Sequence, residues 1–320
     1  MSPDFRNSKS PKIIIAHRGA SGYLPEHTLT SFCYAVAVGA HFIEPDLVMS
    51  GDGEIIVLHD IHLQTTTNVA DIYPDRQHAD GNFYAVDFSL KELKTLHVHE
   101  RTVGKKPLPV YPTRFPLQNS GFPIPTFEEF LMLISGLEKS TGTKIGIYPE
   151  LKAPSYHKQH ALDLVGQTIS LLDKSGYRNK TDQIYLQCFD QETLRKIKFE
   201  LASPYPLIQL LGDNSWNESK TDYDFLQTKE GVSTIVQYAD GVGPWLPQII
   251  DNDGSPKPLL KLLKDVSLKI HPYTVRRDEL PHYADDFDNF LNILFNRLDV
   301  DGIFTDFPDL AIKFLERRRL

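Results

Sequence analysis

Two carboxylates, Glu44 and Asp46, lie in the sequence between two histidines, His17 and His59, and these side chains could together bind a cation and move protons. In a β-strand, residues i and i+2 face the same side, so both carboxylates should point one way. Carboxylates on one buried face repel unless a cation lies between them, and oxygen ligands favour Ca²⁺ or Mg²⁺. The pair predicts a site for one divalent cation. The alternative is that one of them is a surface acid.

The two histidines each follow an apolar run, in IIIAHRG and EIIVLHD. Imidazole can accept or donate a proton near neutral pH, so we interpret His17 and His59 as an acid–base pair. Arg18 offers a guanidinium fork that suits phosphate oxygens. The alternative is a structural histidine beside a surface arginine, and an HRG tripeptide alone leaves both open. We expect Asp60 to orient a histidine or cap the next segment.

A third run, KIGIYPELK, ends in Glu150 and Lys152. Glu150 is a candidate third carboxylate for the same cation, and Lys152 a candidate partner for an anionic substrate or transition state. An ordinary surface pair is the alternative. Gln187, Trp245 and Tyr273 lie at the ends of later apolar runs, where they could line the mouth of a substrate pocket.

Other strand-end residues are expected to be structural. Gly243 and Pro244 are typical of a turn, and Thr305 with Asp306 is typical of a strand-end cap rather than a catalytic pair. The remaining histidines lack spacing typical of metal ligands.

The elements that must position these side chains alternate between strands and helices, which predicts a mainly parallel sheet. Runs 42–48 and 54–58 are too close for a parallel crossover, so we expect a hairpin around Gly51–Asp52 that brings His59 opposite Glu44. With these two runs joined, the count matches a closed (β/α)₈ barrel with a β-hairpin after its second strand. The strand-like runs are 12–16, 42–48, 54–58, 144–151, 183–188, 206–211, 238–243, 268–274 and 301–305.

Helix signals lie between most of these runs. The stretch 28–38 begins on Thr28 and stops at Gly39, Thr126 begins a capping box, and Asp190 is a candidate N-cap. Residues 62–124 break the alternation, and we predict a small insertion near the barrel mouth within a single domain that spans 1–320.

The bulk composition of the 320 residues, with 41% hydrophobic and 24% charged side chains, predicts a packed globular protein. The net charge of −8 argues against nucleic acid as a partner, and no apolar stretch reaches membrane-spanning length. The polar segment MSPDFRNSKSPK lacks the apolar core of a secretory signal, so we expect a cytoplasmic protein, or a periplasmic or secreted one if a leader was removed. Cys33 and Cys188 are expected to be free thiols rather than a disulfide.

The ordered motifs resemble the glycerophosphodiester phosphodiesterase family, and in particular its bacterial periplasmic-type members. The likeness covers nearly the whole chain. It is carried by HRGASGYLPEHT (17–28), EPDLV (44–48), VLHD (57–60), ELK (150–152), DGVGPW (240–245), HPYTVR (271–276) and DGIFTDFPD (301–309). Pro45 between the two carboxylates and the absence of a visible leader depart from the family pattern.

This resemblance implies a (β/α)₈ barrel that hydrolyses glycerophosphodiesters, such as glycerophosphocholine and glycerophosphoethanolamine, to sn-glycerol 3-phosphate and an alcohol. It implies catalysis by His17 and His59, one Ca²⁺ or Mg²⁺ on Glu44, Asp46 and Glu150, and phosphate contacts from Arg18 and Lys152.

The mechanism that we expect has two steps. A hydroxyl of the substrate's glycerol first attacks phosphorus, and water then opens the cyclic phosphate. Two rival functions are compatible with the same fold. One is a phospholipase D-like or cyclising lyase, and the other is a non-catalytic phosphodiester-binding protein. A sugar hydrolase is disfavoured, because its two acids must flank a bond.

Overall fold

The computed structural model describes residues 11–103, 108–117 and 121–317, so parts of the N-terminal segment and of the 62–124 insertion lie outside it. Within these ranges the strands are β1 (Ile13–His17), β2 (Phe42–Glu44), β3 (Asp46–Met49), β4 (Ile55–Val57), β5 (Thr102–Val103), β6 (Leu108–Pro109), β7 (Gly146–Ile147), β8 (Glu150–Leu151), β9 (Leu186–Cys188), β10 (Leu207–Leu211), β11 (Gly241–Pro244), β12 (Lys269–Ile270) and β13 (Gly302–Thr305). The α-helices are α1 (Leu29–Ala37), α2 (Val69–Ile72), α3 (Leu90–Leu93), α4 (Phe127–Thr141), α5 (Pro154–Gln159), α6 (Leu164–Lys174), α7 (Gln191–Arg195), α8 (Tyr223–Leu226), α9 (Lys229–Ile235), α10 (Leu246–Ile249), α11 (Pro258–Asp265), α12 (Phe287–Asn292) and α13 (Pro308–Glu316).

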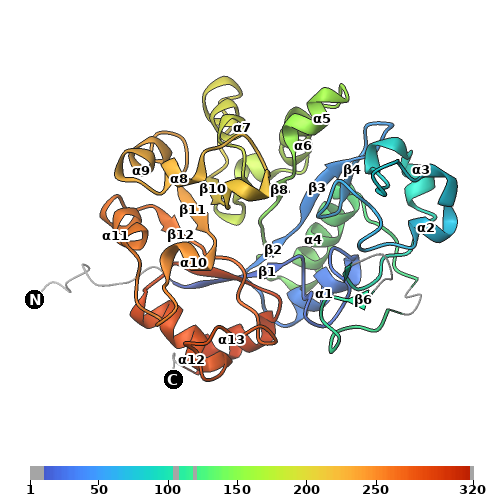
Figure 1. Cartoon of the computed structure of the whole chain (residues 1–320). Coiled ribbons are helices and arrows are strands. Elements are labelled where there is room, and N and C mark those ends of the chain that lie inside the picture. The colour runs from blue at the N-terminus through green and yellow to red at the C-terminus, as the bar shows by residue number, and fades with distance from the viewer. Residues whose placement is uncertain (1–10, 104–107, 118–120, 318–320) are drawn as a thin grey trace, which may run out of the picture.

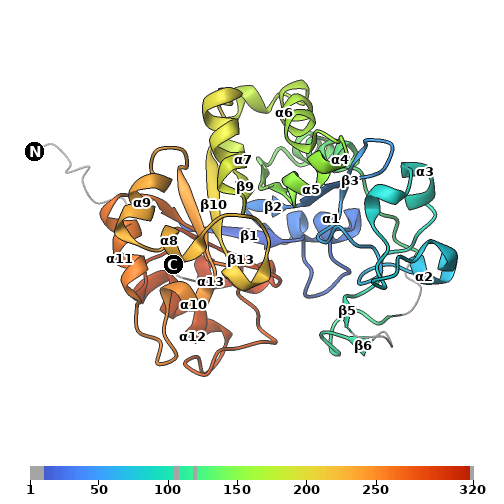
Figure 2. The same ribbon diagram turned by 45° about the horizontal axis from the view of Figure 1, so that its top comes forward.

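The parallel strands close on themselves as a barrel (Figure 1). β1 pairs with β2 and with β13, and the ladder continues through β8, β9, β10, β11 and β12. The ring is completed where the Val275 amide donates to the Phe304 carbonyl at 2.8 Å. The (β/α)₈ prediction is confirmed, and helices α4, α6, α7, α9, α11 and α13 surround the strands (Figure 2).

Two predicted strands are each broken once, at Pro45 and at Pro149. Because proline has no amide hydrogen to donate, each of these prolines interrupts the backbone hydrogen bonds between neighbouring strands at its own position. β2 therefore pairs with β7, and β3 pairs with β8 after the break. The ladder nonetheless continues across both prolines, because the Glu150 amide donates to the Pro45 carbonyl at 2.9 Å.

The predicted hairpin is present as the antiparallel pair β3–β4, with Val48 opposite Ile56. Extending this register places His59 opposite Pro45, one residue from the predicted partner Glu44. The difference arises because the turn centres on Asp52 rather than between Gly51 and Asp52.

The prediction that Gly243 and Pro244 form a turn was wrong. Both lie within the buried strand β11. A Cβ on Gly243 would lie 2.5 Å from Leu210 Cδ2, so glycine is needed here for close strand packing.

The predicted helix caps are confirmed. Thr28 caps α1, and the chain leaves it through Gly39 at a φ of +86°. Thr126 and Glu129 form the reciprocal capping box of α4, and the Asp190 side chain accepts two backbone hydrogen bonds at the start of α7. These caps fix where each helix begins relative to the preceding barrel strand.

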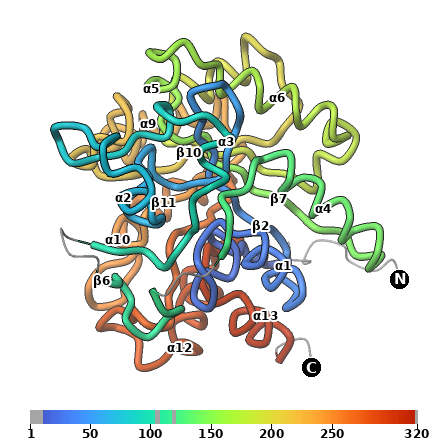
Figure 3. The backbone as a smooth tube through the Cα atoms, turned by 90° about the vertical axis from the view of Figure 1, so that its right-hand side faces the viewer, coloured from blue at the N-terminus to red at the C-terminus, as the bar shows by residue number. Residues whose placement is uncertain are grey.

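The insertion has its own apolar cluster, which is built on the outer face of the hairpin. Val48, Ile56 and Leu58 from the hairpin pack with buried insertion side chains, including Phe83 and Phe88. Figure 3 views the molecule from the side where α2, α3 and β6 lie in Figure 1. The insertion is therefore anchored beside the strands that carry Asp46 and His59.

Both cysteines are free, as predicted, with Cys33 half-buried and Cys188 buried. None of the helices in the described ranges is long and apolar enough to cross a membrane.

Candidate active site

The predicted site residues meet at the carboxyl ends of neighbouring barrel strands, where barrel enzymes carry their chemistry. His17 ends β1 and is in register with Glu44 at the end of β2. Asp46 is in register with Glu150, and Glu150 with Gln187. Parallel register therefore places these five side chains in one layer around the mouth.

Glu44, Asp46 and Glu150 form the acidic triad. One carboxylate oxygen from each lies within 4.8 Å of the others, and the three residues are at most 6% exposed. The Asp46 Oδ1 atom is buried and has no hydrogen-bond partner among the described residues. Three buried carboxylates with an unsatisfied oxygen fit a hard divalent cation.

The pKa values of the three carboxyl groups are shifted from their usual range, and a bound cation would reduce the repulsion between the carboxylates. Burial and the neighbouring carboxylates raise the pKa of Glu44 well above its usual range, while the pKa of Glu150 rises to about 8, chiefly through burial. Burial also acts to raise the pKa of Asp46, but His27 at 2.8 Å holds it well below its usual range. The triad thus concentrates negative charge that its protein neighbours only partly compensate.

His17 is held by a buried carboxylate. Its Nδ1 atom lies 2.6 Å from Asp306 Oδ1, which leaves Nε2 for a substrate. Burial and the Arg18 charge lower the pKa of His17 to about 4, although Asp306 acts in the opposite direction. Asp306, which we expected to be a strand-end cap, therefore contacts His17 instead. The cap itself is Thr305, whose hydroxyl oxygen accepts from the Phe307 amide.

His59 has a matching arrangement. Its Nδ1 atom pairs with Asp60, which also accepts hydrogen bonds from Arg101 at 2.8 Å and Thr65 at 2.6 Å. Burial and the charges of Arg18 and Lys152 lower the pKa of His59 to about 3. Asp60 orients a histidine, one of the two structural roles expected for it.

Arg18 and Lys152 supply the positive charge beside the triad. The Arg18 guanidinium donates to Glu26 at 3.0 Å, and its backbone amide donates to Glu44 at 2.6 Å. The Lys152 ammonium lies 3.0 Å from Glu150 and 3.5 Å from Glu218. Both cations border the cavity that Glu44 and Glu150 of the triad line.

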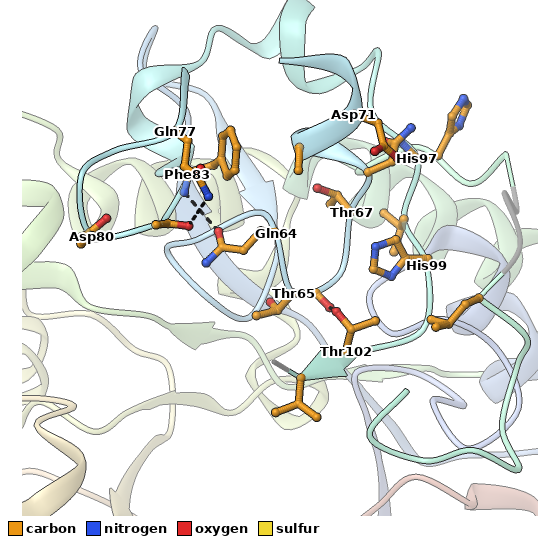
Figure 4. A pocket seen from close by; sticks show the side chains of 16 residues that line it. Gln64, Thr65, Thr67, Asp71, Gln77, Asp80, Phe83, His97, His99 and Thr102 are labelled. Carbon is orange, nitrogen blue, oxygen red and sulfur yellow. Dashed lines mark hydrogen bonds between the residues drawn. The ribbon is translucent and has the colours of Figure 1, made fainter. Parts of the chain in front are cut away.

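This active-site cavity has a volume of about 250 Å³ and contains each predicted substrate-lining residue. Gln187 also donates to Glu44 at 3.2 Å, while Trp245 and Tyr273 form part of an aromatic wall. A larger cavity, of about 970 Å³, lies in the insertion, between side chains that include Gln64 and His99 (Figure 4). None of the triad or the two histidines lines it.

Several neighbours of the site were missed by sequence reasoning. His27, Glu26, Glu218 and Asp306 each contact a predicted site residue, and Arg101 and Arg114 of the insertion hold the carboxylates that contact the two histidines. His27 and Glu26 lie inside the motif that begins at His17, which was the available signal.

The fold and the site together define a barrel enzyme with acid–base groups beside an acidic triad at its mouth. The model of the glycerophosphoryl diester phosphodiesterase family matches residues 17–310. The chain belongs to this family.

The curated relatives support this assignment. The glycerophosphodiester phosphodiesterase of Haemophilus influenzae is 43% identical over 96% of this chain and 91% of its own length. That of Treponema pallidum is 40% identical over 96% and 92%.

Solved structures share the fold. A putative glycerophosphoryl diester phosphodiesterase from Silicibacter pomeroyi has a TM-score of 0.71 at 21% identity and covers 98% of this chain and 96% of its own. A phosphodiesterase from Oleispira antarctica, in complex with the product sn-glycerol-3-phosphate, has a TM-score of 0.64 at 19% identity and covers 96% and 97%.

Proposed function

We propose that the protein is a metal-dependent glycerophosphodiester phosphodiesterase that releases sn-glycerol 3-phosphate and an alcohol from substrates such as glycerophosphocholine and glycerophosphoethanolamine. The observation that carries the proposal is that His17, His59, Glu44 and Glu150 line one cavity of about 250 Å³. The names of the curated relatives and the product bound in the Oleispira structure support it.

Glu44, Asp46 and Glu150 are the residues that would hold the cation, Ca²⁺ or Mg²⁺. When bound, such a cation supplies charge stabilisation for a phosphate oxygen and lowers the pKa of a nearby hydroxyl. The unsatisfied Asp46 oxygen and the raised pKa of Glu150 support this assignment.

The two histidines carry the proton transfers. Each has its Nδ1 atom on a carboxylate, so each presents Nε2 to the cavity. One accepts the proton of the glycerol hydroxyl that attacks phosphorus, and the other protonates the departing alcohol oxygen. Water then opens the cyclic phosphate with the two roles exchanged. Asp306 and Asp60 act to raise the pKa of His17 and of His59, against the larger lowering effect of burial, so each carboxylate stabilises the imidazolium that forms when its histidine takes up a proton.

Arg18 and Lys152 stabilise the negative charge on the non-bridging phosphate oxygens in the transition state. Their nitrogen donors are fixed before the reaction by Glu26 and by Glu150, so little reorganisation is needed in the transition state.

A coupled assay for glycerol 3-phosphate release, run over a panel of glycerophosphodiesters, tests the function. His17→Ala and His59→Ala should each lower kcat by about 10²–10⁴-fold, the usual contribution of acid–base catalysis. His282→Ala, at an exposed position far along the sequence, is the matched control. Near-wild-type turnover in either active-site variant would contradict the acid–base assignment.

Two further measurements separate the parts of the proposal. EDTA should abolish activity and added Ca²⁺ or Mg²⁺ restore it, whereas full activity in EDTA would remove the metal role. Phosphorus NMR should show glycerol 3-phosphate as the end product. A cyclic phosphate that accumulates as the end product would identify a cyclising lyase instead.

A further inference from the structure

A second cavity adjoins the active site on the side of the insertion. This insertion-side recess, of about 230 Å³, shares His17, Arg18, His59 and Arg276 with the active-site cavity. The rest of its wall includes the insertion residues Glu100, Arg101, Val110, Tyr111 and Arg114. Both histidines therefore stand at the junction of two cavities.

A phosphodiester has two alcohol substituents, and a phosphate at this junction would direct one into each cavity. Glu44 and Glu150 line the active-site cavity and not the recess. If the attacking glycerol hydroxyl lies beside the triad, as the proposed function requires, the leaving alcohol must enter the recess. The recess would then contact the head group.

The charged groups of the recess are held by ion pairs, and one carboxyl group, that of Glu100, is only partly satisfied. Arg18 and Arg101 share Glu26, while Arg114 and Arg276 share Asp306. Glu100 differs from these carboxylates. It is only 4% exposed, yet its Oε2 atom has no hydrogen-bond partner among the described residues.

We infer that the insertion-side recess is the head-group subsite and that Glu100 selects alcohols that carry an ammonium group able to donate a hydrogen bond, as ethanolamine does. This inference rests on the proposed function. A buried carboxyl oxygen without a donor is destabilising, and a charged donor on the ligand would satisfy it.

The electrostatics of the recess are consistent with this assignment. Burial raises the pKa of Glu100 to about 8; the charges of Glu26 and Asp306 act in the same direction, while the Arg114 charge and a backbone hydrogen bond from Arg101 act against them. A bound ammonium would stabilise the ionised carboxylate, because an opposite charge nearby favours the charged form. A neutral head group would offer no such compensation.

Glu100→Gln tests the inference with two substrates of nearly equal shape. One is glycerophosphoethanolamine, and the other is sn-glycero-3-phosphopropanol, in which a methyl group replaces the ammonium. The variant should lower kcat/KM for the ethanolamine diester by roughly 10- to 100-fold, the range of a charge-assisted hydrogen bond. The value for the propyl diester should change by less than about threefold. Asp75→Asn, an exposed acid of the insertion, is the matched control and should leave the ratio unchanged.

The outcomes separate this inference from the proposed function. If the wild-type protein cleaves both diesters and Glu100→Gln affects them equally or not at all, the head-group assignment is overturned while the function stands. If the wild-type protein cleaves neither, the function itself fails. The wild-type ratio of kcat/KM values is a check that does not depend on folding of the variant. We expect a preference for the ethanolamine diester of roughly tenfold or more, and a ratio near one would also overturn the assignment.

Discussion

Asp306→Asn is expected to remove most of the activity, because Asp306 holds His17. Asp306 is 1% exposed, and its two oxygens have different partners. Oδ1 lies 2.6 Å from His17 Nδ1, while Oδ2 accepts hydrogen bonds from Arg114 at 2.8 Å and Arg276 at 2.7 Å. An amide has only one acceptor oxygen, so it cannot satisfy both sides.

The arginines decide which way the amide turns. Two guanidinium donors face Oδ2, and an NH₂ group placed there would leave three donors without an acceptor. The amide oxygen of the variant should therefore face Arg114 and Arg276, with its NH₂ group donating to His17 Nδ1. This bond fixes the tautomer that carries its hydrogen on Nε2, so His17 can no longer accept a proton from the substrate there.

The expected loss in kcat is about 10²–10⁴-fold, since acid–base catalysis supplies this range and the wrong tautomer removes it. The loss should fall mainly on kcat rather than on KM, because Asp306 borders the insertion-side recess but does not line the active-site cavity. The assay is steady-state release of glycerol 3-phosphate, with thermal unfolding measured in parallel. Asp309→Asn is the matched control, as this buried acid bonds Tyr23 and Lys313 and not His17.

A double variant distinguishes positioning from general damage. If Asp306 acts through His17, then His17→Ala with Asp306→Asn should be no slower than His17→Ala alone. Additive losses, or a kcat for Asp306→Asn within about threefold of wild type, would refute the tautomer argument.

Three further outcomes follow from the triad, the insertion and the barrel. Saturating Ca²⁺ or Mg²⁺ should raise the melting temperature. At a cation concentration a hundredfold above Kd, the free energy of unfolding should rise by about 2.7 kcal/mol. Glu150→Gln should abolish this rise, and a rise that survives would contradict the ligand set. Because the pKa of Glu100 is raised to about 8 from an ordinary 4.5, its contribution to the free energy of unfolding is present below about pH 4.5 and is lost as the pH rises towards 8. Urea denaturation of Glu100→Gln should therefore show a smaller loss between pH 5 and 8 than wild type does. Gly302→Ala should destabilise the barrel by about 1–3 kcal/mol, because the new Cβ would lie 2.3 Å from Ile13 Cγ1. Gly136→Ala, at an open position within α4, should instead stabilise by about 0.5–1 kcal/mol in the same denaturation assay, and equal effects of the two substitutions would contradict the packing argument.

Local signals explain what could be predicted from the sequence. Caps such as Thr126 with Glu129 act within one helical turn, so the start of α4 is readable without tertiary information. The close spacing of β3 and β4 required a hairpin, and strand alternation required parallel register. Together these predict from the sequence alone that Glu44, Asp46 and Glu150 lie at one end of the barrel.

Non-local pairing explains what could not be predicted. Asp306 is 289 positions from His17 in the sequence, and only closure of the barrel between β13 and β1 brings the two together. The TDF segment still carried the signal of a cap, because Thr305 does cap the next turn while Asp306 points elsewhere. The local TDF motif therefore predicts the role of Thr305 correctly but gives no indication of the contact that Asp306 makes.

The same reasoning changes how the insertion should be understood. Arg101 donates to Asp60, the partner of His59, and Arg114 donates to Asp306, the partner of His17. Both bonds are 2.8 Å long, and both arginines belong to residues 62–124. The barrel supplies each histidine with a carboxylate, but the insertion supplies each carboxylate with a fixed positive charge. On the proposed mechanism, the insertion would take part in proton transfer and form a wall of the head-group recess, so we expect a change in its sequence to alter turnover and substrate choice together.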